Sequence, residues 1–203
     1  MTAAKAPYHH GNLRVALVDA AWDLLRKGDV ESLSLREVAK TVGVSPNAPY
    51  RHFEDKQALL AAVAERGFAE LVELFKASEG MPPKLRLTAI TCAYLDYATA
   101  QPAAYRVMVG KHLHNFANYP ELERTASSAF MTVLEVSAGA VGCGMDDLRA
   151  VRGAMTLWAM VHGLAMLSED CPILMTSPER MPDGEALAAV FALGAKALSD
   201  PTS

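Results

Sequence analysis

Helical spacing of apolar residues along nearly the whole chain is the feature that most limits how these 203 residues can fold. From Leu13 onward, apolar side chains recur at intervals of three and four residues, which places them on one face of a helix. Prolines stand where new helical patterns begin and predict helices near 83–100, 102–113 and 120–139. No alternating strand pattern flanked by turn residues occurs in the sequence. We therefore predict an all-α protein of about nine helices.

Composition supports a globular chain and excludes several other classes. Apolar residues make up 51% of the sequence and charged residues 21%, which is enough to bury a core. Cys92, Cys143 and Cys171 are scattered and form no CxxC pair, which argues against a disulfide scaffold and a zinc site. The first residues lack the apolar run of a secretory signal, and the longest uncharged stretch, 153–168, is short for a membrane span. We expect a cytoplasmic protein with no membrane partner and no cofactor.

Charge is unevenly divided along the chain, although the total is only −4. The first 60 residues carry eight Lys or Arg against seven Asp or Glu, a net charge of +1. The remaining 143 residues carry 11 basic and 16 acidic groups, a net charge of −5. A mildly basic front on an acidic body fits a small phosphate-facing module attached to a larger partner domain.

The segment 34–56 has the spacing of a helix-turn-helix unit. A capping box at Ser34 starts the first helix, and Gly43 ends it. Ala39 is small where two helices would cross, and Val44 follows the turn as an apolar plug. An ordinary helical hairpin carries the same glycine and alanine, so the spacing alone leaves both interpretations open.

The second helix of such a unit, which we predict to begin at Ser45, lies in the major groove of DNA with its first residues nearest the base edges. Asn47 has the side chain that pairs with adenine, and Arg51 has the one that pairs with guanine. The Tyr, His and Lys side chains beside them suit phosphate oxygens. The candidate DNA-binding residues are Ser34, Arg36, Ser45, Pro46, Asn47, Ala48, Tyr50, Arg51, His52 and Lys56.

The wider string LSLREVAKTVGVSPNAPYRHFEDKQALLAAV resembles the N-terminal domain of TetR-type bacterial transcriptional regulators, over roughly residues 10–65. The resemblance rests on Val42-Gly43-Val44-Ser45, Tyr50-Arg51-His52-Phe53 and Lys56-Gln57-Ala58-Leu59-Leu60. Two further strings, Trp158-Ala159-Met160-Val161-His162-Gly163 and Tyr8-His9-His10-Gly11-Asn12-Leu13-Arg14, are similar to motifs of a subfamily named for a Trp…His-Gly pattern. The resemblance implies a DNA-binding domain in residues 1–55, with an arm at 1–10, and a ligand-binding and dimerisation domain in residues 56–203.

Pro49 departs from the resemblance, because many recognition helices of this family have a leucine at that position. Proline lacks the N–H that would bond to the carbonyl of Ser45, and it restricts the backbone of Ala48. We expect this helix to begin as a looser, 3₁₀-like turn. Base contacts expected from relatives therefore do not transfer directly to Asn47 and Ala48.

The helix predicted over 146–169 is apolar on two sides, which predicts burial on both. The stripe that contains Met155 is expected to face one side, and the stripe that contains Val161 the other. One natural solution places one stripe against the interior and the other against a second subunit. The final helix, near 184–198, adds another apolar stripe. The resemblance likewise implies a homodimer through these two helices, which fits a palindromic DNA site.

Aromatic and sulfur-bearing residues of the C-terminal body are the candidates for a ligand pocket. Methionine adapts to varied apolar shapes, and a buried His or Tyr orients one polar group of a ligand. Trp158 and His162, one helical turn apart on the same face, are the leading pair, although all these residues also suit plain core packing. The candidates are Tyr94, Tyr97, Tyr105, Met108, Phe130, Met131, Met155, Trp158 and His162.

Signatures of enzymes are not found in the sequence. The histidines of His112-Leu113-His114 would point to different sides of a helix, and no HExxH, GxSxG, Walker or GxGxxG string occurs. Cys143 lies between two glycines with no Lys, Arg or His nearby in sequence, which weakens a redox role. We expect no enzymatic activity and no metal.

Together these features predict a homodimeric repressor that binds a palindromic operator and is released by a small apolar effector, whose identity is unknown. The helix near 56–78 would link the effector pocket to the DNA-reading segment. One alternative is an activator, or a regulator without an effector. Another is a helical ligand-binding or interaction protein with a degenerate DNA-binding head, and a third is an enzyme on an all-α scaffold.

Overall fold

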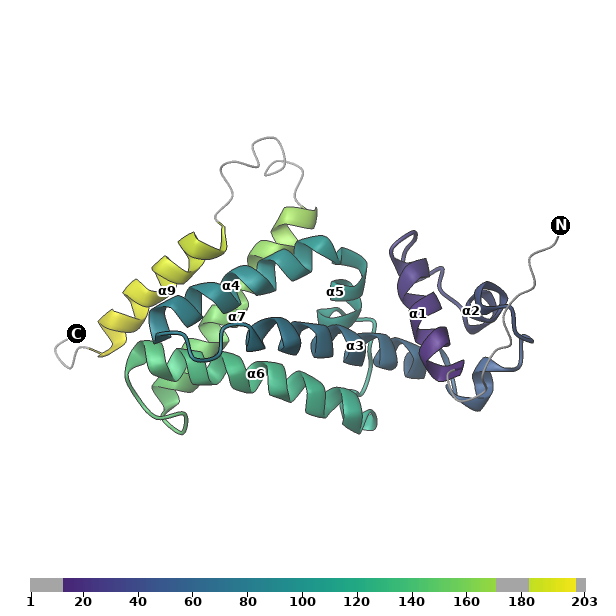
Figure 1. Cartoon of the computed structure of the whole chain (residues 1–203), viewed down its shortest axis with the longest axis horizontal. Helices are drawn as coiled ribbons and strands as arrows, with labels where there is room; N and C mark the ends of the chain where they lie inside the picture. The colour runs from purple at the N-terminus through teal and green to yellow at the C-terminus, as the bar shows by residue number, and fades with distance from the viewer. Residues whose placement is uncertain (1–12, 171–182, 200–203) are drawn as a thin grey trace. The chain divides into compact units, whose positions relative to one another are not determined.

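The computed structural model describes residues 13–170 and 183–199, and within them the chain is helical with no strand. This confirms the predicted fold class. Three helices begin at Pro83, Pro102 and Pro120, because the fixed φ and missing N–H of proline suit a first helical turn. The helices of these residues, drawn in Figure 1, are α1 (Leu13–Leu25), α2 (Leu35–Val42), η2 (Pro49–Arg51), α3 (Lys56–Lys76), α4 (Pro83–Ala100), α5 (Pro102–Val109), η3 (Phe116–Asn118), α6 (Pro120–Val141), α7 (Leu148–Asp170) and α9 (Gly184–Ser199).

The chain forms two compact units. The first contains the residues up to Arg66 and the segment Ala103–Leu122, and the second contains Gly67–Pro102 and the residues from Glu123 onward. The boundary between the units falls inside α3. This division concerns packing, whereas the functional division that we predict, into residues 1–55 and 56–203, stays a prediction.

In the core of the first unit, α1 and α2 pack against each other. Leu17 and Ala21 lie on the buried face of α1, one turn apart. Val38 and Ala39 of α2 are also fully buried. The absence of a long side chain at Ala39 lets the two helices approach closely, as the helix-turn-helix spacing predicts.

Trp22 of α1 is buried beneath a charged cover. Its ring centroid lies 4.4 Å from the guanidinium carbon of Arg66 on α3, and Arg66 also pairs with Asp19 at 2.7 Å. A guanidinium over an indole face is attracted by the ring quadrupole, so the contact fixes α1 against the first half of α3.

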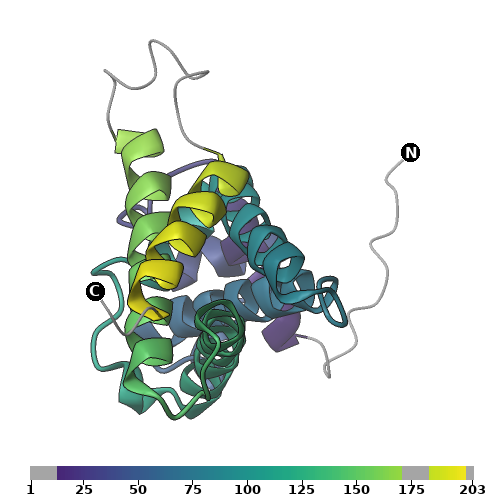
Figure 2. The ribbon, with the colours of Figure 1, turned by 90° about the vertical axis from the view of Figure 1, so that its left-hand side faces the viewer.

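The second unit is organised around α4, which packs against both α7 and α9. Figure 2 shows α9 lying beside α4 and α7. Leu87 and Ile90 of α4 are buried. At Gly184, the first residue of α9, a Cβ would lie 2.6 Å from the Cα of Cys92, so only glycine permits this approach to α4.

Helix α7 has one buried and one exposed apolar face. Ala154, Leu157 and Val161 are buried, whereas Leu148 and Met155 are 66% and 55% exposed. The stretch Leu148–Leu167 is also long and apolar enough to cross a membrane by length and composition, but only one such stretch is found in the described chain. A core helix of a soluble protein passes the same test, so it carries little weight.

Two predicted elements differ from the structure. No α-helix begins at Ser45, where turns and the 3₁₀ helix η2 stand instead. The helix predicted over 102–113 ends at Val109, and Asn115 then adopts a left-handed backbone conformation with φ of 53°. The loop predicted over 170–182 lies almost entirely outside the described residues.

Candidate functional site

The first helix of the helix-turn-helix unit is held at both ends by local hydrogen bonds. The backbone N–H of Glu37 donates to the side-chain oxygen of Ser34 at 3.2 Å, which caps α2. At the other end Gly43 has φ of 79°, and its N–H and that of Val44 donate to the carbonyl of Ala39 at 2.9 and 3.0 Å. A side chain at Gly43 would be strained, so glycine sets the direction in which the chain leaves α2.

The segment after the turn is a series of tight turns rather than an α-helix. The N–H of Ala48 donates to the carbonyl of Ser45 at 2.9 Å, and that of His52 to the carbonyl of Pro49 at 2.9 Å. Both bonds span three residues, as in a 3₁₀ helix. Pro49 has no N–H to return to Ser45, which explains the tighter winding expected from the sequence. Pro49 and Phe53 are buried and anchor the segment.

The structure places most of the predicted DNA-binding residues at the surface. The side chain of Tyr50 is 49% exposed, whereas Ala48 and Lys56 are half-buried. The other predicted residues, all exposed, are Ser34, Arg36, Ser45, Pro46, Asn47, Arg51 and His52. We call the predicted residues between Ser45 and His52 the reading strip, which is interrupted by the buried Pro49.

Lys56 opens α3 and is held by the loop before α2. Its Nζ donates to the backbone carbonyl of Glu31 at 2.9 Å. The N–H of Ala58 donates to Asp55 Oδ1 at 2.8 Å, so Asp55 caps α3 as its position predicts. An ammonium has three N–H donors, so Lys56 retains capacity for a phosphate oxygen.

Gln57 forms a clamp that the sequence analysis missed. Its Nε2 donates to the carbonyl of His112 at 2.9 Å, and the N–H of His114 donates to its Oε1 at 3.2 Å. The Nδ1 of His112 also lies 3.6 Å from a carboxylate oxygen of Glu31. These hydrogen bonds tie the segment after α5 to the start of α3. The partners are more than fifty residues apart, and no feature of the sequence predicts the contact.

Three of the predicted pocket residues form a packed cluster in the second unit. Trp158 Nε1 donates to the hydroxyl of Tyr94 at 3.1 Å, and the ring centroids of Trp158 and Phe130 lie 5.3 Å apart. The two cavities lined by Tyr94 and Trp158 hold only about 10 Å³ each. This cluster is therefore closely packed, and its role in binding a ligand stays a prediction.

The remaining predicted pocket residues are dispersed. Met131 and Met155 are 49% and 55% exposed and do not line those cavities. Tyr105 and Met108 are buried in the first unit, and His162 is half-buried on α7. Of the predicted set, only Tyr97 lines a third, roomier cavity in the described part of the second unit.

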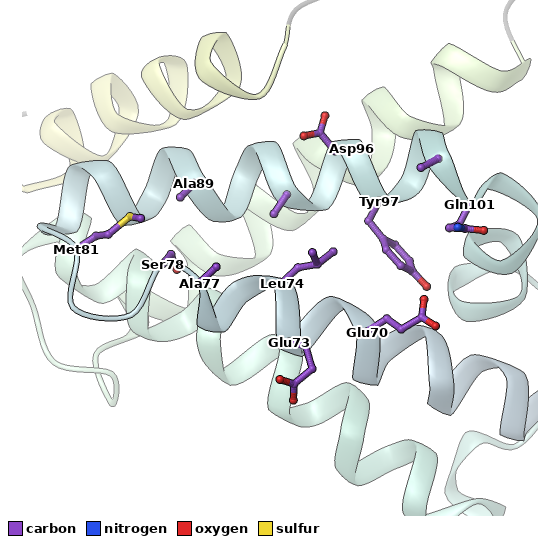
Figure 3. Close-up of a pocket in the computed structure, with 12 residues that line it drawn as sticks. Glu70, Glu73, Leu74, Ala77, Ser78, Met81, Ala89, Asp96, Tyr97 and Gln101 are labelled. Atoms are coloured by element: carbon purple, nitrogen blue, oxygen red, sulfur yellow. The ribbon is translucent and has the colours of Figure 1, made fainter. Parts of the chain in front are cut away.

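That cavity is a groove of about 800 Å³ between the second half of α3 and α4, shown in Figure 3. We call it the α3/α4 groove. Small side chains at Ala89 and Ala93 on α4 leave the space, while carboxylates stand on both helices. The sequence feature that could have indicated this groove is the helical spacing of the alanines on α4, which follows a helix with acidic residues. The lining residues are Glu70, Glu73, Leu74, Ala77, Ser78, Met81, Ala89, Ala93, Asp96, Tyr97, Ala100 and Gln101.

A short capped helix, a left-handed glycine turn and an exposed polar strip, followed by a helical unit with a groove, define a helix-turn-helix protein with a helical body. A family model described as "Bacterial regulatory proteins, tetR family" matches residues 17–63. A second, described as "Tetracyclin repressor-like, C-terminal domain", matches residues 87–195, which is more than half of the chain. The chain belongs to the TetR family of bacterial regulatory proteins.

Solved structures of similar proteins share the fold of this chain. A protein of unknown function from Rhodococcus sp. RHA1 is 30% identical, with a TM-score of 0.75 over 97% of this chain and 100% of that chain. A tetR-family transcriptional regulator from Streptomyces coelicolor is 18% identical, with a TM-score of 0.72 over 97% of this chain and 85% of that one. The regulator PfmR from Thermus thermophilus is 18% identical, with a TM-score of 0.61 over 88% of this chain and 96% of that one. The narrower resemblance to the Trp…His-Gly subfamily stays a prediction.

Proposed function

We propose that this protein is a transcriptional repressor that binds a palindromic operator as a homodimer and is released by a small, largely apolar effector. The observation that carries the proposal is the reading strip, which displays polar side chains on a buried scaffold. Pro49 and Phe53 anchor it from below, while Asn47 and Arg51 remain exposed. These are side chains with which proteins read adenine and guanine.

The dimer is supported by the exposed face of α7 and by α9. Leu148, Met155 and Leu167 are 51% to 66% exposed, and Val190 of α9 is 58% exposed. Large apolar side chains gathered on one helix face mark a surface that a partner covers. A two-fold dimer through α7 and α9, at the ranges near 146–169 and 184–198, would present two reading strips to successive major grooves.

The response to an effector would run through α3. This helix begins at Lys56, directly after the reading strip, and its residues from Glu70 to Ala77 border the α3/α4 groove. The effector must bind better to the conformation that fits DNA poorly, and a tenfold loss of operator affinity requires a difference of about 1.4 kcal/mol. The protein would act in the cytoplasm as a regulator without enzymatic activity, with residues 1–55 for DNA and residues 56–203 for the effector and the dimer.

The testing experiment selects bound duplexes from a random pool with the full-length protein, then measures affinity for the selected duplex as salt is raised. A palindromic site bound by a dimer, at least a thousandfold tighter than random DNA, is the expected result on the usual scale of specific over non-specific binding (about 10³ to 10⁷). Weak binding without a motif would contradict the proposal. It would favour a helical ligand-binding protein with a degenerate head, for which the 3₁₀ winding at Pro49 is the supporting observation.

A further inference from the structure

Gln57, the second residue of α3, uses both ends of its side-chain amide to hold the segment after α5. Its Nε2 donates to the carbonyl of His112, and its Oε1 accepts from the N–H of His114. Gln57 is half-buried, so both hydrogen bonds are partly shielded from water. An amide that acts as donor and acceptor toward two nearby backbone groups fixes the position of a segment as well as its direction.

The held segment, residues 110–114, follows a backbone path that is specified at both ends. A Cβ at Gly110 would collide with the carbonyl oxygen of Arg106, so only glycine lets the chain leave α5 in this direction. Just beyond the segment, Asn115 has φ of 53°, a conformation that is uncommon in residues other than glycine. The segment is therefore directed to the start of α3 by its own backbone as well as by Gln57.

The contacts close a ring that includes Lys56. His112 Nδ1 lies 3.6 Å from a carboxylate oxygen of Glu31, in the loop before α2. The backbone carbonyl of the same Glu31 accepts from Lys56 Nζ at 2.9 Å. Because Lys56 directly precedes Gln57, loss of the Gln57 amide would release His112, then Glu31, and with it the group that holds the Lys56 ammonium.

Every member of this ring belongs to the first compact unit, which contains the residues up to Arg66 and the segment Ala103–Leu122. The residues 110–114 therefore pack in the same unit as the reading strip, although they lie far along the chain. A cation that is already held in place loses less conformational freedom when it contacts a phosphate, so the ring would favour binding by Lys56.

We propose that Gln57 is a positioning residue for DNA binding, which holds the Lys56 ammonium in place for a phosphate oxygen through the segment 110–114 and Glu31. This segment is then part of the DNA-binding machinery, although our division of the chain places it in residues 56–203. The inference rests on the proposed function only in its consequence for DNA, and it requires no effector.

The first experiment measures binding of the full-length protein, without any ligand, to the selected operator as salt is raised. Gln57→Leu removes both hydrogen bonds at a similar side-chain size. It should weaken binding to every sequence about tenfold at 0.1 M salt and lower the salt slope by about one, as expected for one lost phosphate contact. Asn118→Leu, which removes an exposed amide of the same unit outside the ring, should change neither. Unchanged binding by Gln57→Leu would overturn the proposal.

A double-mutant cycle tests whether Gln57 acts through Lys56. In the Lys56→Ala background, Gln57→Leu should weaken operator binding less than about twofold, because the cation that it positions is absent. In the Arg51→Ala background, the same substitution should still weaken binding about tenfold. An equal loss in both backgrounds would contradict positioning and would indicate general damage to the first unit.

Hydrogen exchange measured by NMR without DNA tests the docking of the segment by itself. In Gln57→Leu the N–H of His114 should exchange at least about tenfold faster, whereas that of Ala58, which donates to Asp55, should keep its rate. An unchanged rate at His114 would overturn the proposal.

Folding of each variant is checked by circular dichroism. If Gln57→Leu does not fold, Gln57→Glu takes its place in all three measurements, because it keeps the acceptor for the His114 N–H and loses only the donor to His112. A parent protein that binds no duplex would refute the proposed function, and hydrogen exchange would still decide whether Gln57 docks the segment. Normal binding by the parent and by a folded Gln57 variant would refute the positioning role alone.

Discussion

At the scale of single residues, two basic side chains, Arg51 within the reading strip and Lys56 just beyond it, are held differently. Arg51 is exposed at the end of η2, and its guanidinium has the paired donors that match guanine. Lys56 is half-buried and already donates to the carbonyl of Glu31 at 2.9 Å. A point charge tethered to a backbone carbonyl suits a fixed phosphate contact better than the reading of a base.

Arg51→Ala and Lys56→Ala should therefore affect DNA binding in different ways. Arg51→Ala should lose about 1–3 kcal/mol on the selected operator and relax the preference for one base pair. Lys56→Ala should weaken binding to every sequence about equally and lower the salt slope by about one. Salt-titrated binding to the operator and to singly changed operators checks both. A uniform loss on all sequences for Arg51→Ala would refute its role in base reading.

At the scale of elements, local signals predicted helix starts well and spatial contacts poorly. Pro83, Pro102 and Pro120 each begin a helix, because the preference of proline for a first turn depends on its own backbone alone. The clamp of Gln57 on the segment after α5 and the α3/α4 groove were missed. Both depend on residues distant in sequence, and the groove exists only because side chains on two helices fail to fill the space between them.

Candidate site residues show the same difference. Residues of the reading strip follow one another in sequence after the turn at Gly43, so their proximity was predictable. Pocket candidates came from residue type and from helical spacing, and neither says whether Trp158 contacts a ligand or packs on Phe130. In the structure the latter contact is made, with ring centroids 5.3 Å apart.

The winding of η2 can be tested at Pro49. Pro49→Ala supplies the N–H that can reach the Ser45 carbonyl, and we expect residues 47–52 to become more α-helical through one hydrogen bond worth about 1 kcal/mol. Backbone carbon chemical shifts measured by NMR report this change. Pro46→Ala is the matched control, because Pro46 is exposed in the first turn, where a missing N–H has little effect. Unchanged shifts in Pro49→Ala would mean that proline does not cause the 3₁₀ winding.

The ion pair that joins α4 to α6 should make stability depend on pH. Hydrogen bonding from Arg86, at 2.8 and 2.9 Å to the two carboxylate oxygens, lowers the pKa of Glu135 below its ordinary value of 4.5. The stabilisation is therefore present above about pH 4.5 and is lost as the pH falls through the lower pKa of the folded protein.

Glu135→Gln should lower the free energy of unfolding by about 0.5–1 kcal/mol at pH 7, since the Glu135 side chain is half exposed and screened by solvent. The difference from the parent protein should shrink as the pH is lowered below 4.5. Urea unfolding at several pH values measures it, with Glu123→Gln on the exposed side of the same helix as the control. A difference that is constant across pH would show that charge is not its cause.

At the scale of the whole molecule, the exposed apolar face of α7 bears on whether the protein acts as a single chain or as a dimer. The buried stripe through Ala154, Leu157 and Val161 satisfies the interior of one subunit. The opposite face, with Leu148 and Met155, remains uncovered in a single chain. If a second copy of the chain covers this face, the resulting two-fold dimer would also account for a palindromic operator.

Met155→Glu should convert the dimer into monomers, because a buried carboxylate without a partner is strongly unfavourable at an interface. We expect the dimer dissociation constant to rise about a hundredfold, which corresponds to about 2.7 kcal/mol, and operator affinity to fall with it. Analytical ultracentrifugation measures the first and gel shift the second. Met131→Glu, at a similarly exposed methionine of α6, should leave both unchanged. Monomers in both variants would point to general destabilisation.

The two tryptophans of the chain are divided between the two units, with Trp22 in the first and Trp158 in the second. Each indole therefore provides a tryptophan fluorescence signal that is specific to its own unit. The indole of Trp22 lies under the Arg66 guanidinium, whereas that of Trp158 donates a hydrogen bond to Tyr94, so the two fluorophores have different surroundings. A Trp22→Phe variant makes the emission report on the second unit alone, and Trp158→Phe does the same for the first. With this pair of variants, the order in which DNA and a ligand perturb the two units can be followed in real time without an added dye.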